Sequence, residues 1–170
     1  MKRLLIILAS VALLASCQTT QKELTPEERQ EIADQVKKTF NESLELYRDL
    51  TVANFEKSLQ YFVETDDPAW MGDPVMLQNM LYSIKTKERL DEVFRPDPNS
   101  NRKGQDYQEE TSNVAVISDD CAVCVFTGKV AYTFKDTTPT IYQPISGSYV
   151  YVKKDGKWKC LHAHQSWVNE

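Results

Sequence analysis

His162 and His164 are the only histidines in this 170-residue chain, and imidazoles are the side chains best suited to proton transfer near neutral pH. They are two residues apart in a segment with strand character, so a strand would place both rings on one face. The pair could shuttle a proton or form half of a metal site, which would need a carboxylate or third nitrogen beside it. Alternatively, both rings are structural and bond to Ser146, Ser148 or the backbone.

Cysteine offers a second possible chemistry, because Cys121 and Cys124 have the CxxC spacing of redox proteins. A redox motif needs its first cysteine at a helix N-terminus, where the thiolate is stabilised. The run around these residues is β-branched and aromatic, which predicts a strand. Positions three apart in a strand point to opposite faces and lie about 10 Å apart, too far for a disulfide. We therefore expect buried, unreactive thiols, and no cysteine or histidine spacing indicates a metal site or cofactor.

Cys17 has a different setting, because it follows Leu14-Ala15-Ser16 at the end of an apolar run that starts after Lys2 and Arg3. A short basic segment, a short apolar segment and a small-residue site are typical of an export signal, and the run is too short to cross a bilayer. The Leu-Ala-Ser-Cys sequence resembles the lipobox of bacterial lipoproteins. That resemblance implies cleavage before Cys17 and acylation of this residue, which anchors the chain to a membrane of the bacterial cell envelope.

Composition predicts one acidic domain after the signal. The chain has 20 basic and 25 acidic residues, and removal of Lys2 and Arg3 leaves a formal charge of −7. This balance argues against a nucleic-acid partner and against adhesion to anionic lipid through the domain itself. We predict a signal segment over residues 1–16, a tether over 17–24 and a single domain over 25–170.

The first half of the domain is predicted to be helical. Thr25, Pro26 and Glu28 form the pattern of a capped N-terminus, and the apolar stripe that follows consists of Ile32, Val36, Phe40, Leu44 and Tyr47. A second short helix is expected to start at Thr51 or Asn54 and to carry Phe55, Leu59 and Phe62. Two strands over 69–77 and 80–85, a short helix after Thr86 and a polar, mobile loop over 97–106 are predicted next.

The remainder is predicted to be strands over 113–118, 122–134, 146–153 and 157–168, with Gly128 at a bend or bulge. Helices followed by a mainly antiparallel sheet indicate an α+β fold, in which the curved sheet wraps around the N-terminal helices. For the last hairpin we expect a three-residue loop that pairs Val152 with Trp158 and Val150 with Cys160. This register turns both histidines toward the interior. It leaves an apolar outer face, interpreted either as a partly covered surface cluster or, preferably, as a homodimer interface, formed by Tyr149, Tyr151, Leu161, Ala163 and Trp167.

Three segments resemble the nuclear transport factor 2-like superfamily, in its SnoaL-like and ketosteroid-isomerase-like branch. They are Asn54–Phe62 with Asp66–Trp70, then Lys85–Phe94, and finally Lys153–Ser166, which holds a Gly-x-Trp run and a His-x-Ser-like ending. The resemblance implies a cone of curved sheet on helices with a pocket at its open end, and dimers in many members. The fold of this superfamily hosts isomerases, cyclases, dehydratases and binding modules, so the resemblance does not fix a reaction.

The expected function is binding of a small, largely apolar ligand or peptide in the pocket, without catalysis. Expected pocket residues are Trp70, Tyr82, Tyr132, Ser148, His162 and His164. One alternative is an isomerase, dehydratase or cyclase that uses His164 or Asp66 as its acid or base. Another is a dimeric interaction module whose interior is filled by side chains.

Overall fold

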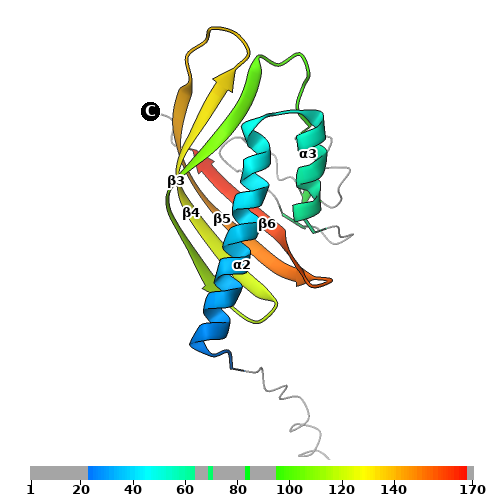
Figure 1. Ribbon diagram of the computed structural model, residues 1–170, viewed down its shortest axis with the longest axis vertical. Helices are drawn as coiled ribbons and strands as arrows, with labels where there is room; N and C mark the ends of the chain where they lie inside the picture. Colours follow the sequence, from blue (N-terminus) through cyan, green and yellow to red (C-terminus); the bar gives the residue numbers. More distant parts are fainter. Residues whose placement is uncertain (1–22, 64–68, 71–82, 85–94, 168–170) are drawn as a thin grey trace, which may run out of the picture.

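The computed structural model describes residues 23–63, 69–70, 83–84 and 95–167 (Figure 1). The helical part comprises α2 (Pro26–Glu45), η1 (Leu46–Arg48), α3 (Val52–Ser58) and η2 (Leu59–Tyr61). Two short strands, β1 (Ala69–Trp70) and β2 (Ser83–Ile84), pair with each other. Four long strands then form an antiparallel sheet in the order β3–β4–β5–β6, with bounds Arg102–Val116, Cys121–Phe134, Ile141–Lys154 and Lys157–Trp167. The predicted α+β fold is confirmed.

Helix α2 begins as its sequence predicts. The Thr25 hydroxyl accepts from the Glu28 amide at 3.2 Å, and the Glu28 carboxylate accepts from the Thr25 amide at 2.9 Å, which completes a capping box. Its buried residues are Ile32, Val36, Phe40 and Ser43, spaced three to four apart on one stripe. Helix α3 is capped by Thr51, one of the two predicted starts.

The apolar stripe of α2 packs on one face of the four-stranded sheet (Figure 1), called here the helix-facing face. The Phe40 ring lies 5.6 Å from the ring of Phe126 and 4.9 Å from that of Tyr149, measured between centroids. Burial of one such side chain stabilises the fold by about 1.5–3 kcal/mol. The opposite side of the sheet is called the outer face.

Strand β3 begins earlier than the sequence indicates. Residues 102–106 were expected to belong to a mobile loop, yet β3 starts at Arg102 and pairs with β4 along its length. Backbone contacts explain this correction, since Gly104 pairs with Thr133 and the Lys103 carbonyl accepts from the Leu50 amide at 2.8 Å. A strand at the edge of a sheet can be polar because much of it faces water, so composition alone suggested a loop.

Gly128 marks an irregularity, as predicted. It pairs with Glu109, and the register shifts between Glu109 and Thr111, so Glu110 is an extra residue in β3. A Cβ atom at position 128 would lie 2.1 Å from the Gln108 carbonyl oxygen. Only glycine fits this close approach of two backbones.

The last hairpin differs from the expected register. Asp155 and Gly156 form a two-residue loop with φ angles of 51° and 74°, as a type I′ turn requires. Lys153 therefore pairs with Trp158, and its amine lies 5.7 Å from the centre of the indole ring. The amine is exposed at the end of the sheet while the ring is buried, so a lysine can be paired with a core tryptophan here.

A bulge then changes the faces of β6. Tyr151 pairs with Cys160, but Val150 pairs with His162, so Leu161 is an extra residue. Before the bulge, Trp158 and Cys160 face the helix; after it, Ala163 does. His162 and His164 consequently lie on the outer face.

Replacement of Gly128 by alanine is expected to destabilise the fold. The added Cβ would collide with backbone rather than with a flexible side chain, so we expect the free energy of unfolding to fall by about 2 kcal/mol or more. Urea unfolding followed by circular dichroism measures this change. Lys129→Ala, at the exposed neighbouring position, is the control and should stay within about 0.5 kcal/mol of the wild type. Equal loss in both variants would contradict the close approach.

Candidate functional site

The six predicted pocket residues are not gathered at one place. His162 is paired with Val150 and His164 with Ser148 on the outer face, and the His164 Nε2 atom lies 3.0 Å from the Ser166 hydroxyl. The expectation that both rings face the interior is wrong, because the bulge at Leu161 reverses the alternation of β6. Ser148 shares the outer face, whereas Tyr132 is buried on the helix-facing face.

Other predicted positions are not described. Asp66, Tyr82 and the side chain of Trp70 lie outside the described residues, as do Cys17 and the helix expected after Thr86. A catalytic role for Asp66 or His164 therefore stays a prediction. Strands β1 and β2 coincide with parts of the predicted pair over 69–77 and 80–85.

The predicted dimer face also needs correction. Tyr149 and Tyr151 are 6% and 1% exposed and belong to the core beneath α2. Ala163 is buried in the same core, and Leu161 is the extra residue of the bulge. Trp167 pairs with Ile145 through its backbone, and its side chain is not among those described. The residues that face outward instead include Val123, Val125, Val150 and Val152.

The thiols behave as the sequence predicts. Cys121, Cys124 and Cys160 are free, and the first two lie in strand β4. Burial raises the pKa of the Cys124 thiol to about 11 and that of the Cys160 thiol to about 12. Protonated thiols are poor nucleophiles, so these cysteines act as small apolar residues.

Four tyrosines gather where η1 meets the helix-facing side of the sheet, and we call them the tyrosine cluster: Tyr47 of η1, Tyr107 of β3, and Tyr149 and Tyr151 of β5. The rings of Tyr47 and Tyr107 lie 6.4 Å apart, and Tyr107 also approaches Phe126 at 6.3 Å. Tyr47 lies just after the C-terminal end of α2, and its element η1 contacts β3, the strand of Tyr107.

Two of these phenols are paired with helix serines. The Tyr47 hydroxyl donates to the Ser58 hydroxyl at 3.3 Å, and Tyr151 is hydrogen-bonded to Ser43. Each serine hydroxyl in turn donates a hydrogen bond to a helical carbonyl 2.7 Å away, Ser58 to that of Phe55 and Ser43 to that of Phe40. The serines therefore accept from the phenols, and these two O–H groups are used within the protein.

The other two phenols share Gln165. The Gln165 amide lies 2.6 Å from the Tyr149 hydroxyl and also forms a hydrogen bond with Tyr107. Gln165 lies beyond the bulge and two residues after Ala163, so both side chains lie on the helix-facing face. Tyr107, Tyr149 and Gln165 are called here the donor trio.

Burial keeps the whole cluster uncharged. Desolvation is the main cause that raises the pKa of each of the four phenols, and the rise is largest for the deeply buried Tyr107, Tyr149 and Tyr151. Among the described residues, the leading electrostatic effects on them come from other phenols and from thiols. Neutral phenols donate hydrogen bonds but do not remove protons, so the cluster can hold and polarise an oxygen atom without acid–base turnover.

Sequence reasoning missed this cluster. Tyr149 and Tyr151 were placed on the wrong face, Tyr107 follows directly on the segment taken for a loop, and Gln165 carried no motif. The alternation Tyr149-x-Tyr151 within a β-branched run was the one available signal, since aromatic residues two apart share a face.

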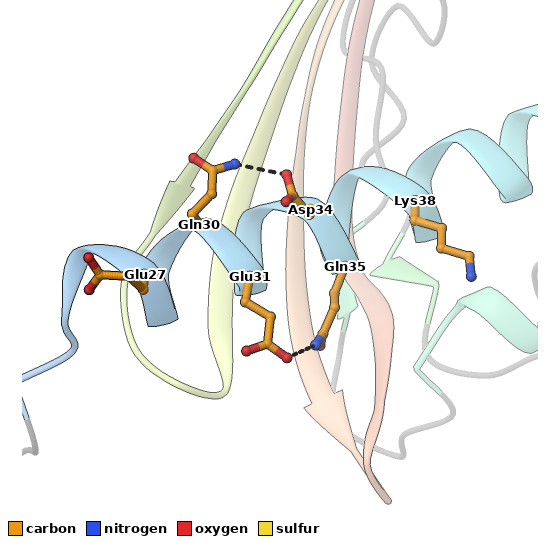
Figure 2. Close-up of a pocket in the computed structure, with 6 residues that line it drawn as sticks. All are labelled: Glu27, Gln30, Glu31, Asp34, Gln35 and Lys38. Carbon is orange, nitrogen blue, oxygen red and sulfur yellow. Dashed lines mark hydrogen bonds between the residues drawn. The ribbon is translucent and has the colours of Figure 1, made fainter.

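Two surface hollows are less suited to bind a ligand than the tyrosine cluster is. One of about 510 Å³ lies along α2 alone, and Figure 2 shows its side chains bonded to one another, Gln30 to Asp34 at 2.8 Å and Gln35 to Glu31 at 3.1 Å. The other, of about 370 Å³, lies between α2, η2 and the β5–β6 turn. In this second hollow, the Trp158 indole N–H already donates to the side-chain oxygen of Gln35 at 3.0 Å.

The described residues contain no group of three potential metal ligands. None of the described helices is long and apolar enough to span a membrane.

Comparisons with known proteins agree with this architecture. A family model described as a SnoaL-like domain matches residues 36–170. A search of functionally curated proteins found no significant match.

Solved structures share the fold at low sequence identity. A candidate scytalone dehydratase from Novosphingobium aromaticivorans is 10% identical with a TM-score of 0.67, covering 85% of this chain and 89% of that one. A nuclear transport factor 2-like superfamily protein from Salmonella enterica is 16% identical with a TM-score of 0.61, covering 86% and 95%.

A third structure is an assembly domain. The association domain of C. elegans CaMKII is 18% identical with a TM-score of 0.60, covering 84% of this chain and 99% of that one. The four-stranded sheet over α2 is the fold that this chain shares with the nuclear transport factor 2-like protein. The match of the family model over most of the domain shows that this chain belongs to the SnoaL-like family.

Proposed function

We propose that this chain is a lipid-anchored protein of the bacterial envelope whose domain binds a small, largely apolar ligand in its interior, without catalysis. The observation that carries the proposal is the tyrosine cluster, in which uncharged polar groups lie among apolar and aromatic side chains beneath α2. Ligand sites commonly combine a predominantly apolar lining with a few placed hydrogen-bonding groups.

Catalysis has less support. The Novosphingobium protein that shares this fold is named as a dehydratase, but likeness at 10% identity carries the fold alone. Dehydration and isomerisation need an acid or base that reaches the substrate. The phenols of the tyrosine cluster are held protonated, and His164 lies on the other side of the sheet.

Native mass spectrometry of the chain purified from its own host tests ligand binding. We expect a bound molecule that is lost on unfolding, and its abundance should fall in Tyr149→Phe but persist in the exposed control Tyr142→Phe. Incubation of the protein with the released molecule distinguishes binder from enzyme, because a binder returns it unchanged. Protein that carries no molecule under the mildest conditions would overturn the proposal.

The anchor is proposed from Cys17 and the tether that follows it. Gln18 to Leu24 span at most about 25 Å when extended, so the start of α2 would lie close to the membrane surface. Leu24 packs against the core, which fixes the end of the tether to the domain.

Replacement of Cys17 by serine is expected to abolish acylation, because the serine hydroxyl cannot take the place of the thiol. Wild-type protein from a bacterial host should have the mass of residues 17–170 plus its acyl groups and should sediment with membranes. Cys121→Ser, a half-buried cysteine of the domain, is the control and should keep both properties. An unmodified wild-type mass would contradict the anchor.

We also propose that two copies associate through the outer face. Two neighbouring rows of the sheet, Ala115–Val123–Val150–His162 and Asn113–Val125–Ser148–His164, are free of carboxylates and amines, and Val125 in their middle is 46% exposed. Exposed apolar surface of this kind is typical of contact surfaces. The association domain of CaMKII, which shares the fold, is by its name an assembly module.

A charge at the centre of this face should weaken the dimer. We expect Val125→Lys to raise the dissociation constant of the acylated chain in detergent at least about tenfold, measured by light scattering after size-exclusion chromatography, because the amine would be buried without a partner. Ile117→Lys, an exposed apolar residue at the β3–β4 turn, is the matched control. A monomeric wild type would rule out the interface.

A further inference from the structure

We infer that the ligand of the interior is an uncharged molecule with a hydrogen-bond-accepting oxygen, received by the donor trio of Tyr107, Tyr149 and Gln165. This inference rests on the proposed function, and it adds the chemical class of the ligand and the residues that select it. Three observations support it: the number of donor hydrogens in the trio, the lack of a free charge beside it among the described residues, and the position of the Tyr149 ring over Gly147.

The donor trio holds more donors than it uses. Two phenolic O–H groups and the two N–H bonds of an amide give four donor hydrogens. The trio makes two hydrogen bonds, Gln165 with Tyr149 and Gln165 with Tyr107, and its side chains form no others with the described residues. Within the part of the chain that the structure describes, two donor hydrogens therefore remain without an acceptor, whichever way the amide group is turned.

Unused donors at this depth are costly. Tyr149 is 6% exposed, and a buried polar group without a partner costs about 1–3 kcal/mol. Tyr47 and Tyr151 in the same cluster are each satisfied by a serine, so the surplus is confined to the trio. An oxygen with two lone pairs, as in a ketone, ester or amide carbonyl, can accept both hydrogens at once.

The described surroundings disfavour an ionised ligand. Asp106, next to Tyr107, is already paired with Arg48, and Glu109 with Lys37, so neither pair offers a free opposite charge to a ligand. A charge brought into such a region without a partner is strongly disfavoured. A neutral acceptor is the class that gains from the donors without this cost.

Gly147 positions the trio. It pairs with Gln165 across β5 and β6, and a Cβ atom at position 147 would lie 3.1 Å from the Tyr149 hydroxyl and 3.0 Å from its ring. The absence of a side chain lets the Tyr149 ring lie along its own strand and reach Gln165. The geometry makes Gln165 a positioning and selecting residue rather than a filler of the core.

Three probes with one skeleton test the class of ligand: acetophenone with a neutral acceptor, ethylbenzene without an acceptor and benzoate with a negative charge. Binding to the acylated chain at pH 7 is measured by ligand-detected NMR titration. We expect acetophenone to bind at least about tenfold more tightly than ethylbenzene, and benzoate to bind most weakly.

Variants identify the residues responsible. Tyr149→Phe and Gln165→Met keep the approximate volume but remove donors, so each should bring the preference for acetophenone over ethylbenzene to within about twofold. Tyr151→Phe is the matched control: it also loses a buried hydroxyl, but one that is used by Ser43, and it should keep the preference. Circular dichroism shows whether each variant is folded. If either Tyr149→Phe or Gln165→Met is unfolded, the other one still tests the role of the donor trio.

The outcomes separate the two proposals. If ethylbenzene binds as tightly as acetophenone, if benzoate binds most tightly, or if Tyr151→Phe abolishes the preference as Tyr149→Phe does, the inference about the ligand class fails while binding itself stands. If neither neutral probe binds the wild-type chain, the interior does not take such ligands and the proposed function fails with it.

Discussion

One extra residue in β6 determines which side chains of the last hairpin lie beneath helix α2. Side chains of a strand alternate between two faces, so an insertion of one position exchanges the faces of everything that follows. Because of Leu161, Trp158 and Cys160 share a face with Ala163 and Gln165, while both histidines turn outward. The core, the donor trio and the outer face all follow from this single irregularity.

The helix-facing side then combines two properties that usually conflict, close packing and unused hydrogen-bonding capacity. Phe40 contacts both Phe126 and Tyr149, so the aromatic rings are held by α2. Helix serines satisfy the phenols of Tyr47 and Tyr151, whereas those of Tyr107 and Tyr149 depend on Gln165. Among the described residues, paired phenols and phenols with donor hydrogens to spare therefore lie side by side in one cluster.

Local signals in the sequence were sufficient for α2, the start of α3, β4 and β6. Thr25 with Glu28 specifies a helix start through contacts within four residues, and Thr51 caps α3 as one of its two expected starts. The bulge at Leu161 and the early start of β3 depend on partners far away in the sequence, which local patterns do not contain. The candidate site was missed for the same reason, since it assembles Tyr107, Tyr149 and Gln165 from three strands. The expected three-residue loop put Tyr149 on the wrong face, and the bulge at Leu161 changed the face of Gln165.

Strand β3 has a consequence for how copies of this protein meet at high concentration. It lies at the edge of the four-stranded sheet, and two irregularities interrupt it, between Arg102 and Gly104 and between Glu109 and Thr111. Part of its backbone is already bonded, since the Lys103 carbonyl accepts from the Leu50 amide and the Val116 carbonyl from the Arg29 guanidinium. Such an edge is a poor template for another strand, because incoming chains find charged side chains and a broken ladder. The irregular edge therefore opposes growth into continuous β-ribbons and the aggregation that such growth begins.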